Sequence, residues 1–122
     1  MKYARIALSL EPRDGTLLTS FEATPLSIAA VSAPDVMKQV ASAVLAGFTD
    51  VDDRERAVLF STFRVWADAG GSINDAAQRL HCHANTVRHR LRRVEEVTGR
   101  SLSRPIELAE LCLAFEVDLL VG

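Results

Sequence analysis

The sequence predicts a mainly α-helical fold: a small helical bundle preceded by a short α/β fragment at the N-terminus. Three observations lead to this prediction. From residue 52 onward, apolar residues recur at the spacing of an amphipathic helix. Residues that commonly cap or stop helices stand at the ends of these segments. Before residue 50 the pattern is less regular and includes one segment with the composition of a strand.

The composition is that of an ordinary globular protein. Apolar residues make up 48% and charged residues 25% of 122 positions, which suits one domain, or a small domain with a fragment of another. No apolar run approaches the roughly 20 residues of a membrane span, and a signal peptide is not apparent. We therefore expect a cytoplasmic protein with no membrane segment, in which Cys82 and Cys112 are free thiols.

Residues 1–50 contain short elements rather than an obvious domain. Thr16–Phe21 predicts one strand, and prolines after Thr24 and Ala33 predict helices over 25–32 and 35–47. Leu26–Val31 could instead be a buried strand, because so short a segment has no clear period. A lone strand is unstable, so this half is expected to be the end of a larger domain or to need a partner. The residues expected to face inward in the second helix are Val36, Val40, Val44 and Leu45.

The next predicted helix begins after the acidic segment 50–53. Asp52 or Asp53 can cap it, and it should run to Ala69, where Gly70-Gly71 ends it. Aromatic residues at helical spacing are far more often core than ligand pocket. The expected core face consists of Leu59, Phe60, Phe63, Trp66 and Ala67.

Residues 72–99 predict two helices joined by a tight turn, a helix-turn-helix. Ser72 can cap the first helix, and the segment His81–Ala84 interrupts the apolar period for about one turn. Gly99 can end the second helix, predicted over about 84–98. The stripe of the first helix is Ile73, Ala76, Ala77 and Leu80, and its alanines would allow close helix packing. The stripe of the second helix is Val87, Leu91, Val94 and Thr98.

The opposite face of the second helix carries polar groups suited to the major groove of DNA. Arginine can pair with guanine and asparagine with adenine through two hydrogen bonds each. The alternative is an arginine-rich helix that is simply solvated. Residues 79–104 hold seven arginines and two glutamates, a local charge of +5, although the chain carries −2. The polar face consists of Asn85, His89, Arg92 and Arg93, flanked by Thr86 and Arg88.

The last predicted helix begins at Pro105 and is apolar on more than one face. Such a helix needs cover on several sides, either within its own domain or from a second copy of the chain. We expect a homodimer, since DNA readers of this type commonly pair through two-fold symmetry. The expected dimer contacts are Leu108, Leu111, Cys112, Phe115 and Leu119.

Other chemistry finds little support in the sequence. His81, Cys82 and His83 invite a metal-site interpretation, with Cys112 as a fourth ligand, but consecutive residues do not readily surround one zinc ion. A glycine-rich phosphate loop and a nucleophile elbow are both absent. We therefore predict a protein that is not an enzyme and that uses neither a metal nor a cofactor.

The run from Gly70 to Leu102 resembles the C-terminal helix-turn-helix domain of the PucR-type transcriptional regulators, the purine-catabolism and sugar-diacid activators. The resemblance is strongest in NTVRHRLRRVEEVTG and covers about residues 52–122. It implies a Fis-like helix-turn-helix DNA-binding domain over 51–122. It also implies that residues 1–50 are the tail of a GGDEF-like regulatory domain, which need not be complete. Two departures from the family pattern are Ala84, where arginine is usual, and His89, where tyrosine is usual.

The predicted function is sequence-specific binding of double-stranded DNA, with the second helix in the major groove. Arg90 lies near the core stripe and is excluded from base reading, since it is expected either to extend its stem along the apolar surface or to pair with Glu110 or another acid. Arg92 could pair with Glu96 at i, i+4. The residues assigned to base edges are Asn85, Arg88, His89 and Arg92. The residues assigned to phosphates are Thr86, Arg93, Arg100 and Arg104.

Two alternatives of other classes remain at this point. A helix-turn-helix with an apolar last helix could be a protein-interaction or dimerisation module that does not bind DNA, docking for example on RNA polymerase. RNA recognition is a weaker option, since no aromatic stacking platform lies outside the expected core.

Overall fold

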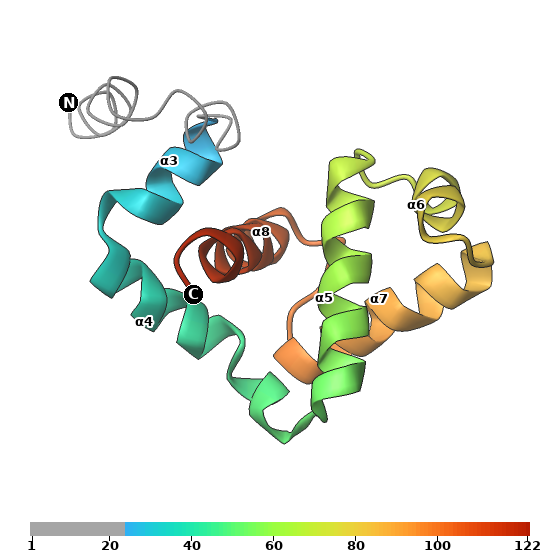
Figure 1. Ribbon diagram of the computed structural model, residues 1–122, viewed down its shortest axis with the longest axis horizontal. Coiled ribbons are helices and arrows are strands. Elements are labelled where there is room, and N and C mark those ends of the chain that lie inside the picture. Colours follow the sequence, from blue (N-terminus) through green and yellow to red (C-terminus); the bar gives the residue numbers. More distant parts are fainter. Residues whose placement is uncertain (1–23) are drawn as a thin grey trace. The chain divides into compact units, whose positions relative to one another are not determined.

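The computed structural model describes residues 24–122, which fall into two compact units (Figure 1). One unit is residues 44–112, and the other joins residues 24–43 to residues 113–122. Every regular element among the described residues is a helix, which confirms the mainly α-helical fold. The strand predicted at Thr16–Phe21 lies outside the described residues.

The unit of residues 44–112 is built on three mutually packed helices, α5 (Asp53–Asp68), α6 (Ile73–Leu80) and α7 (Ala84–Thr98). The short 3-10 helix η1 (Ala46–Asp50) packs against α7, and α8 (Pro105–Leu120) begins in this unit. In Figure 1, α6 lies beside the N-terminal end of α7, to which a short turn joins it. The predicted helix-turn-helix is therefore present as α6 and α7.

The ends of these helices are set by the residues that the sequence singled out. The Asp52 carboxylate accepts hydrogen bonds from the backbone N–H groups of Arg54 and Glu55, at 2.8 and 3.1 Å. The Ser72 hydroxyl accepts from the Asp75 N–H at 3.1 Å. Gly99 ends α7 with a φ of 68°, the left-handed conformation that glycine adopts without strain. Local capping chemistry thus fixes the boundaries of the helix-turn-helix.

The core of this unit follows the predicted stripes in part, since Phe60, Trp66 and Leu80 are only half-buried. Phe48 packs edge-on against Phe60, with ring centroids 4.9 Å apart. Ala67 was expected in the core but is exposed, whereas Thr62 is fully buried. Thr62 tolerates burial because its hydroxyl donates to the Val58 carbonyl at 2.8 Å. The buried residues shared by α5, α6 and α7 are Leu59, Thr62, Phe63, Ala76, Ala77, Val87, Leu91 and Val94.

The turn between α6 and α7 is closed by backbone hydrogen bonds. His81 takes the left-handed conformation, with φ 55° and ψ 46°. This lets the Cys82 N–H reach back to the Ala77 carbonyl at 3.0 Å. The turn therefore depends on a non-glycine residue in a region that usually favours glycine.

The other unit contains α3 (Pro25–Ser32), most of α4 (Pro34–Val44) and the C-terminal part of α8. Thr24 and Ser27 form a reciprocal capping box, in which the Thr24 N–H donates to Ser27 Oγ at 2.9 Å and the Ser27 N–H donates to Thr24 Oγ1 at 3.1 Å. The helix predicted over 25–32 is thus confirmed, and the alternative strand over Leu26–Val31 is wrong.

The helix predicted over 35–47 is shorter than expected. α4 ends at Val44, and η1 follows it. Of the residues expected inward, Val44 is buried, whereas Val36 is 55% exposed; Ala41, which was not predicted, is also buried.

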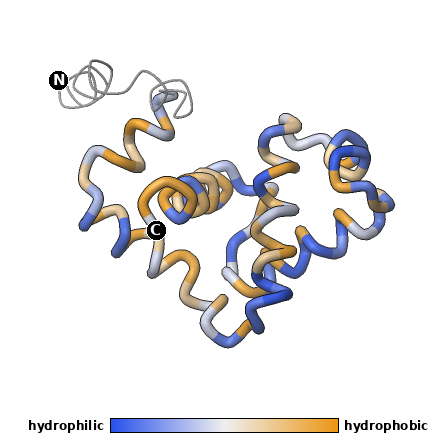
Figure 2. Tube along the Cα trace, in the orientation of Figure 1, coloured by the Kyte–Doolittle hydropathy of each residue, from blue (hydrophilic) through white to orange (hydrophobic). Residues whose placement is uncertain are grey.

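α8 carries apolar residues along most of its length (Figure 2). Leu111, Phe115 and Val117 are buried, whereas Ile106 and Leu119 are exposed. Among residues 24–122, no helix combines the length and apolar character that crossing a membrane requires.

Candidate nucleic-acid interface

The helix α7 has a buried face and an exposed polar face. Val87, Leu91 and Val94 are buried toward the unit's core. Because successive residues of a helix are about 100° apart, the side chains opposite this stripe face solvent. The exposed side chains on that side include four of the predicted contacts, Asn85, Arg88, His89 and Arg92.

Asn85 and Arg88 are held to each other on the exposed face. Arg88 Nη1 donates to Asn85 Oδ1 at 2.8 Å, across one turn of the helix. The Asn85 amide NH₂ and the remaining N–H groups of Arg88 are not used in this contact. The pair therefore presents several donors in a restrained arrangement.

Arg92 is exposed and forms no ion pair with the described residues. The expected pairing of Arg92 with Glu96 is wrong, because Glu96 lies instead 3.7 Å from Nη1 of Arg93. On a helix surface, residues three and four positions apart are equally close, so Glu96 can pair with Arg93 in place of Arg92. Arg92 thus keeps its whole guanidinium available to a ligand.

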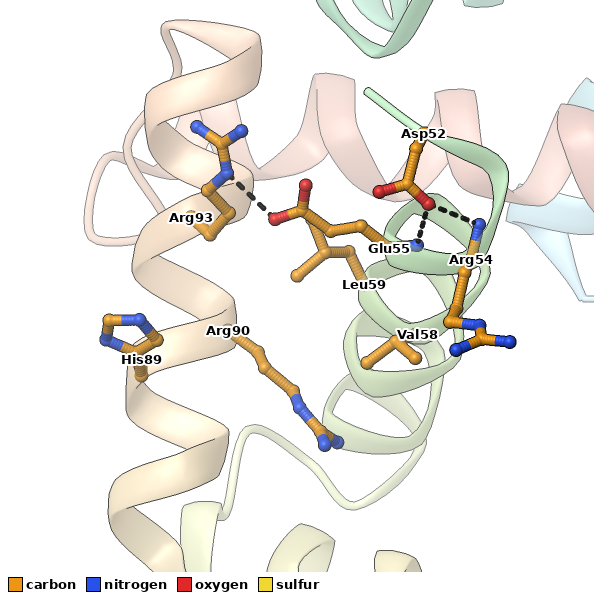
Figure 3. A pocket seen from close by; sticks show the side chains of 8 residues that line it. All are labelled: Asp52, Arg54, Glu55, Val58, Leu59, His89, Arg90 and Arg93. Atoms are coloured by element: carbon orange, nitrogen blue, oxygen red, sulfur yellow. Dashed lines mark hydrogen bonds and ion pairs between the residues drawn. The ribbon is translucent and has the colours of Figure 1, made fainter.

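Arg93 joins α7 to α5. Its Nε donates to the Glu55 carboxylate at 3.1 Å, across 38 positions of sequence (Figure 3). The hydrogen bond with Glu55, and then the charge of Glu55, raises the pKa of Arg93 above its ordinary value. Both side chains remain about two-fifths exposed. Arg93 is therefore a permanent cation that already has an anionic partner in the free protein.

Arg90 points from α7 toward α5 rather than outward (Figure 3). Its Nη1 lies 3.4 Å from the Thr62 hydroxyl, in hydrogen-bonding geometry. The expected pairing of Arg90 with Glu110 is wrong, since Glu110 bonds Arg100 at 3.1 Å. Arg90 thus fastens the two helices and is not placed to read bases.

The loop after α7 is tied down by carboxylates. The Leu102 N–H donates to Glu95 at 2.8 Å, and the Ser101 N–H donates to Glu107 at 2.7 Å. Arg100 donates to Glu110, and Arg104 lies 3.6 Å from Glu107. The sequence singled out the arginines and Glu110 but not Glu95 or Glu107, and it did not give the pairs, because the pairing depends on how α8 follows the end of α7.

The start of α7 lacks a side-chain cap. His83 occupies the N-cap position and forms no capping hydrogen bond with its side chain. The first N–H groups of the helix therefore have no side-chain acceptor, and Thr86 lies half-buried in the same turn. Such a helix start favours an anion.

His81, Cys82 and His83 do not form a metal-binding cluster. Across residues 24–122, no group of three histidine, cysteine or acidic side chains comes close enough to hold an ion. The three residues instead form the turn between α6 and α7.

The residues expected at the dimer contact differ in how far their side chains are exposed to solvent. Leu111 and Phe115 are buried within the chain, and Leu108 and Cys112 are half-buried. Leu119 is 58% exposed. Of the five, Leu119 alone offers a largely open side chain to a second copy; the sequence could not make this distinction because α8 is apolar nearly all round.

Comparison with known proteins gives relatives that are much longer than this chain. An uncharacterised protein of Mycobacterium tuberculosis (strain H37Rv) is 39% identical over 84 residues, which cover 66% of this chain and 20% of the relative. A Mycobacterium bovis protein matches to the same extent. The purine catabolism regulatory protein of Bacillus subtilis (strain 168) is 29% identical over 86 residues, 70% of this chain and 16% of that protein.

The chain therefore spans about a fifth, or less, of the length of these relatives. No solved structure matches it. The match to a known domain falls on the helix-turn-helix and its neighbours: residues 59–117 match the PucR C-terminal helix-turn-helix domain.

Proposed function

We propose that this chain provides the DNA-binding domain of a PucR-family transcriptional regulator and binds double-stranded DNA sequence-specifically, with α7 in the major groove. One observation carries the proposal. The second helix of a helix-turn-helix turns Asn85, Arg88, His89 and Arg92 to solvent while burying its apolar stripe. The match of residues 59–117 to the PucR domain supports the same function.

In the proposed complex the contacts divide into two kinds. Asn85, Arg88, His89 and Arg92 meet base edges, and the bond between Asn85 and Arg88 restrains both side chains before DNA arrives. Phosphates are met by Thr86 and the uncapped start of α7 and by Arg93, Arg100 and Arg104. The proposed contacts bind DNA without catalysing a reaction, and they require no cofactor.

The wider setting belongs to the same proposal. We place the protein in the bacterial cytoplasm, where its DNA lies, and we assign residues 51–122 to the DNA-binding domain. Residues 1–50 are proposed to be the tail of the GGDEF-like regulatory domain. A homodimer through α8 would present two copies of α7 to half-sites about ten base pairs apart, or a multiple of that. RNA polymerase is a further candidate partner.

Selection of bound duplexes from a random pool, at two salt concentrations, tests this function. We expect one enriched sequence, repeated as two half-sites. Arg88→Ala should then cost about 1–3 kcal/mol on the selected duplex and relax the preference at one position. Arg100→Ala should weaken binding to all duplexes alike and reduce the salt slope by about one unit.

A matched control is Arg56→Ala, which removes the same charge from α5, where Arg56 pairs with Asp53. It should change DNA affinity much less than either variant. Equal losses on selected and random duplexes for Arg88→Ala and Arg100→Ala would refute the division into base and phosphate contacts.

The alternative function is a protein-interaction module, favoured by the exposed apolar side chains Ile106 and Leu119 on α8. If no duplex is enriched while the protein self-associates through α8, this alternative is correct and the DNA-binding proposal is wrong.

A further inference from the structure

The arginines of the proposed interface differ in what holds them before DNA arrives. Arg88 is bonded to a neutral amide, and Arg92 has no described ion pair. Arg93, Arg100 and Arg104 each lie against a carboxylate of their own chain. The arginines assigned to bases thus have no carboxylate of the described residues beside them, whereas those assigned to phosphates already lie beside one.

The pair of Arg93 with Glu55 is the most informative of these contacts. The donor is Nε, at 3.1 Å from Glu55, and Glu96 lies 3.7 Å from Nη1 on the other side. Arg93 is thus flanked by two carboxylates, and Arg54 and Arg90 line the same hollow. A DNA phosphate that approaches Arg93 therefore meets a cation that is already paired with an anion.

The pair also lies next to the proposed reading face. Arg93 and Glu55 line an open hollow of about 420 Å³ between the N-terminal part of α5 and α7, together with His89 and Arg90 (Figure 3). The hollow has room for a phosphate group. Since both side chains are about two-fifths exposed, Arg93 can exchange one partner for another without unfolding α5 or α7.

We propose that Glu55 is an internal competitor of the DNA backbone: its carboxylate occupies Arg93 in the free protein, and a phosphate must displace it. Glu55 then sets the strength of one backbone contact although it never touches DNA itself. This inference rests on the proposed DNA-binding function. It identifies a residue on α5 that tunes the affinity of the helix-turn-helix.

Glu55→Gln tests the proposal because it removes the charge and keeps the shape of the side chain. We expect the full chain to bind both the selected and a random duplex about two- to fivefold more tightly, since an exposed ion pair is worth at most about 1 kcal/mol. In an Arg93→Ala background the same substitution should improve binding no more than Asp50→Asn does. The measurement is fluorescence anisotropy titration of the four proteins of this cycle, each checked for an unchanged unfolding midpoint.

Asp50→Asn is the matched control. It changes the net charge equally, lies just before α5, and removes a carboxylate that forms no ion pair with the described residues. The proposal requires that Asp50→Asn improve binding less than Glu55→Gln.

Three results would overturn the inference while leaving the proposed function intact: equal gains for Asp50→Asn and Glu55→Gln, a gain of undiminished size without Arg93, or weaker binding by Glu55→Gln. The last would make Glu55 a support that positions Arg93 for DNA. Failure of the function itself looks different, because then neither the wild-type protein nor any variant binds duplex and Arg88→Ala changes nothing.

Discussion

His81 is a non-glycine residue in the left-handed backbone conformation, which side chains other than glycine's hydrogen disfavour. It holds the turn of the helix-turn-helix at φ 55°, where a Cβ atom crowds the backbone. We expect His81→Gly to raise the free energy of unfolding by about 0.5–1 kcal/mol, because glycine adopts this conformation without strain. Denaturant unfolding measures the change, and a less stable variant would mean that the imidazole makes a contribution larger than the strain.

Gly99 offers the converse substitution at the end of α7. Its φ is 68°, and a Cβ added there would meet no atom within 4 Å. Gly99→Ala should therefore destabilise the protein by about 1 kcal/mol through backbone strain alone. The same unfolding measurement applies, and a neutral effect would show that the chain can shift out of the left-handed region at this point.

At the scale of elements, the contact of η1 with α7 depends on a glycine for a different reason. Gly47 does not have a positive φ, but a Cβ there would lie 2.1 Å from the Val97 carbonyl oxygen. That distance is impossible without moving η1 away from α7. We expect Gly47→Ala to cost about 2–4 kcal/mol, more than Gly99→Ala, in denaturant unfolding. Equal costs for the two variants would mean that η1 relaxes easily.

Asp52 and His83 each stand at the start of a helix, but we expect truncating them to alanine to change the free energy of unfolding unequally. Asp52 accepts two backbone hydrogen bonds, whereas His83 caps nothing. Asp52→Ala should lower the free energy of unfolding by about 1 kcal/mol, and His83→Ala should change it by only a few tenths. Thermal unfolding of both variants checks this, and a large loss for His83→Ala would contradict the assignment.

At the scale of the whole molecule, the question is how much of α8 serves folding and how much serves association. Leu119 is exposed, and Phe115 is 2% exposed. Leu119→Glu should leave the unfolding midpoint nearly unchanged and weaken self-association, because a charge would enter the proposed dimer contact. Sedimentation equilibrium over a range of concentrations measures this.

Phe115→Ala supplies the contrast. It should cost about 3–5 kcal/mol of stability, because it empties a buried aromatic site. If Leu119→Glu leaves the mass in solution unchanged, the dimer does not form through this end of α8.

Much of the fold could be predicted from the sequence because it is encoded locally. Capping at Asp52 and Ser72, the stop at Gly99 and the helical period of Val87, Leu91 and Val94 each depend on residues within one or two turns. Local interactions of this kind need no knowledge of the rest of the chain. The helix-turn-helix and the two faces of α7 were therefore predictable, and the structure bears out both.

Only the tertiary structure decided which arginines are free. Arg93 pairs with Glu55 across 38 positions, Arg90 turns to Thr62 rather than to Glu110, and Arg100 takes Glu110 instead. The same holds for burial along α8, where an apolar pattern on every side cannot indicate which side is covered. The sequence alone determined where α5, α6 and α7 begin and end and which charges they carry. The partners of those charges follow from how α5, α7 and α8 pack, and long-range packing has no local signature.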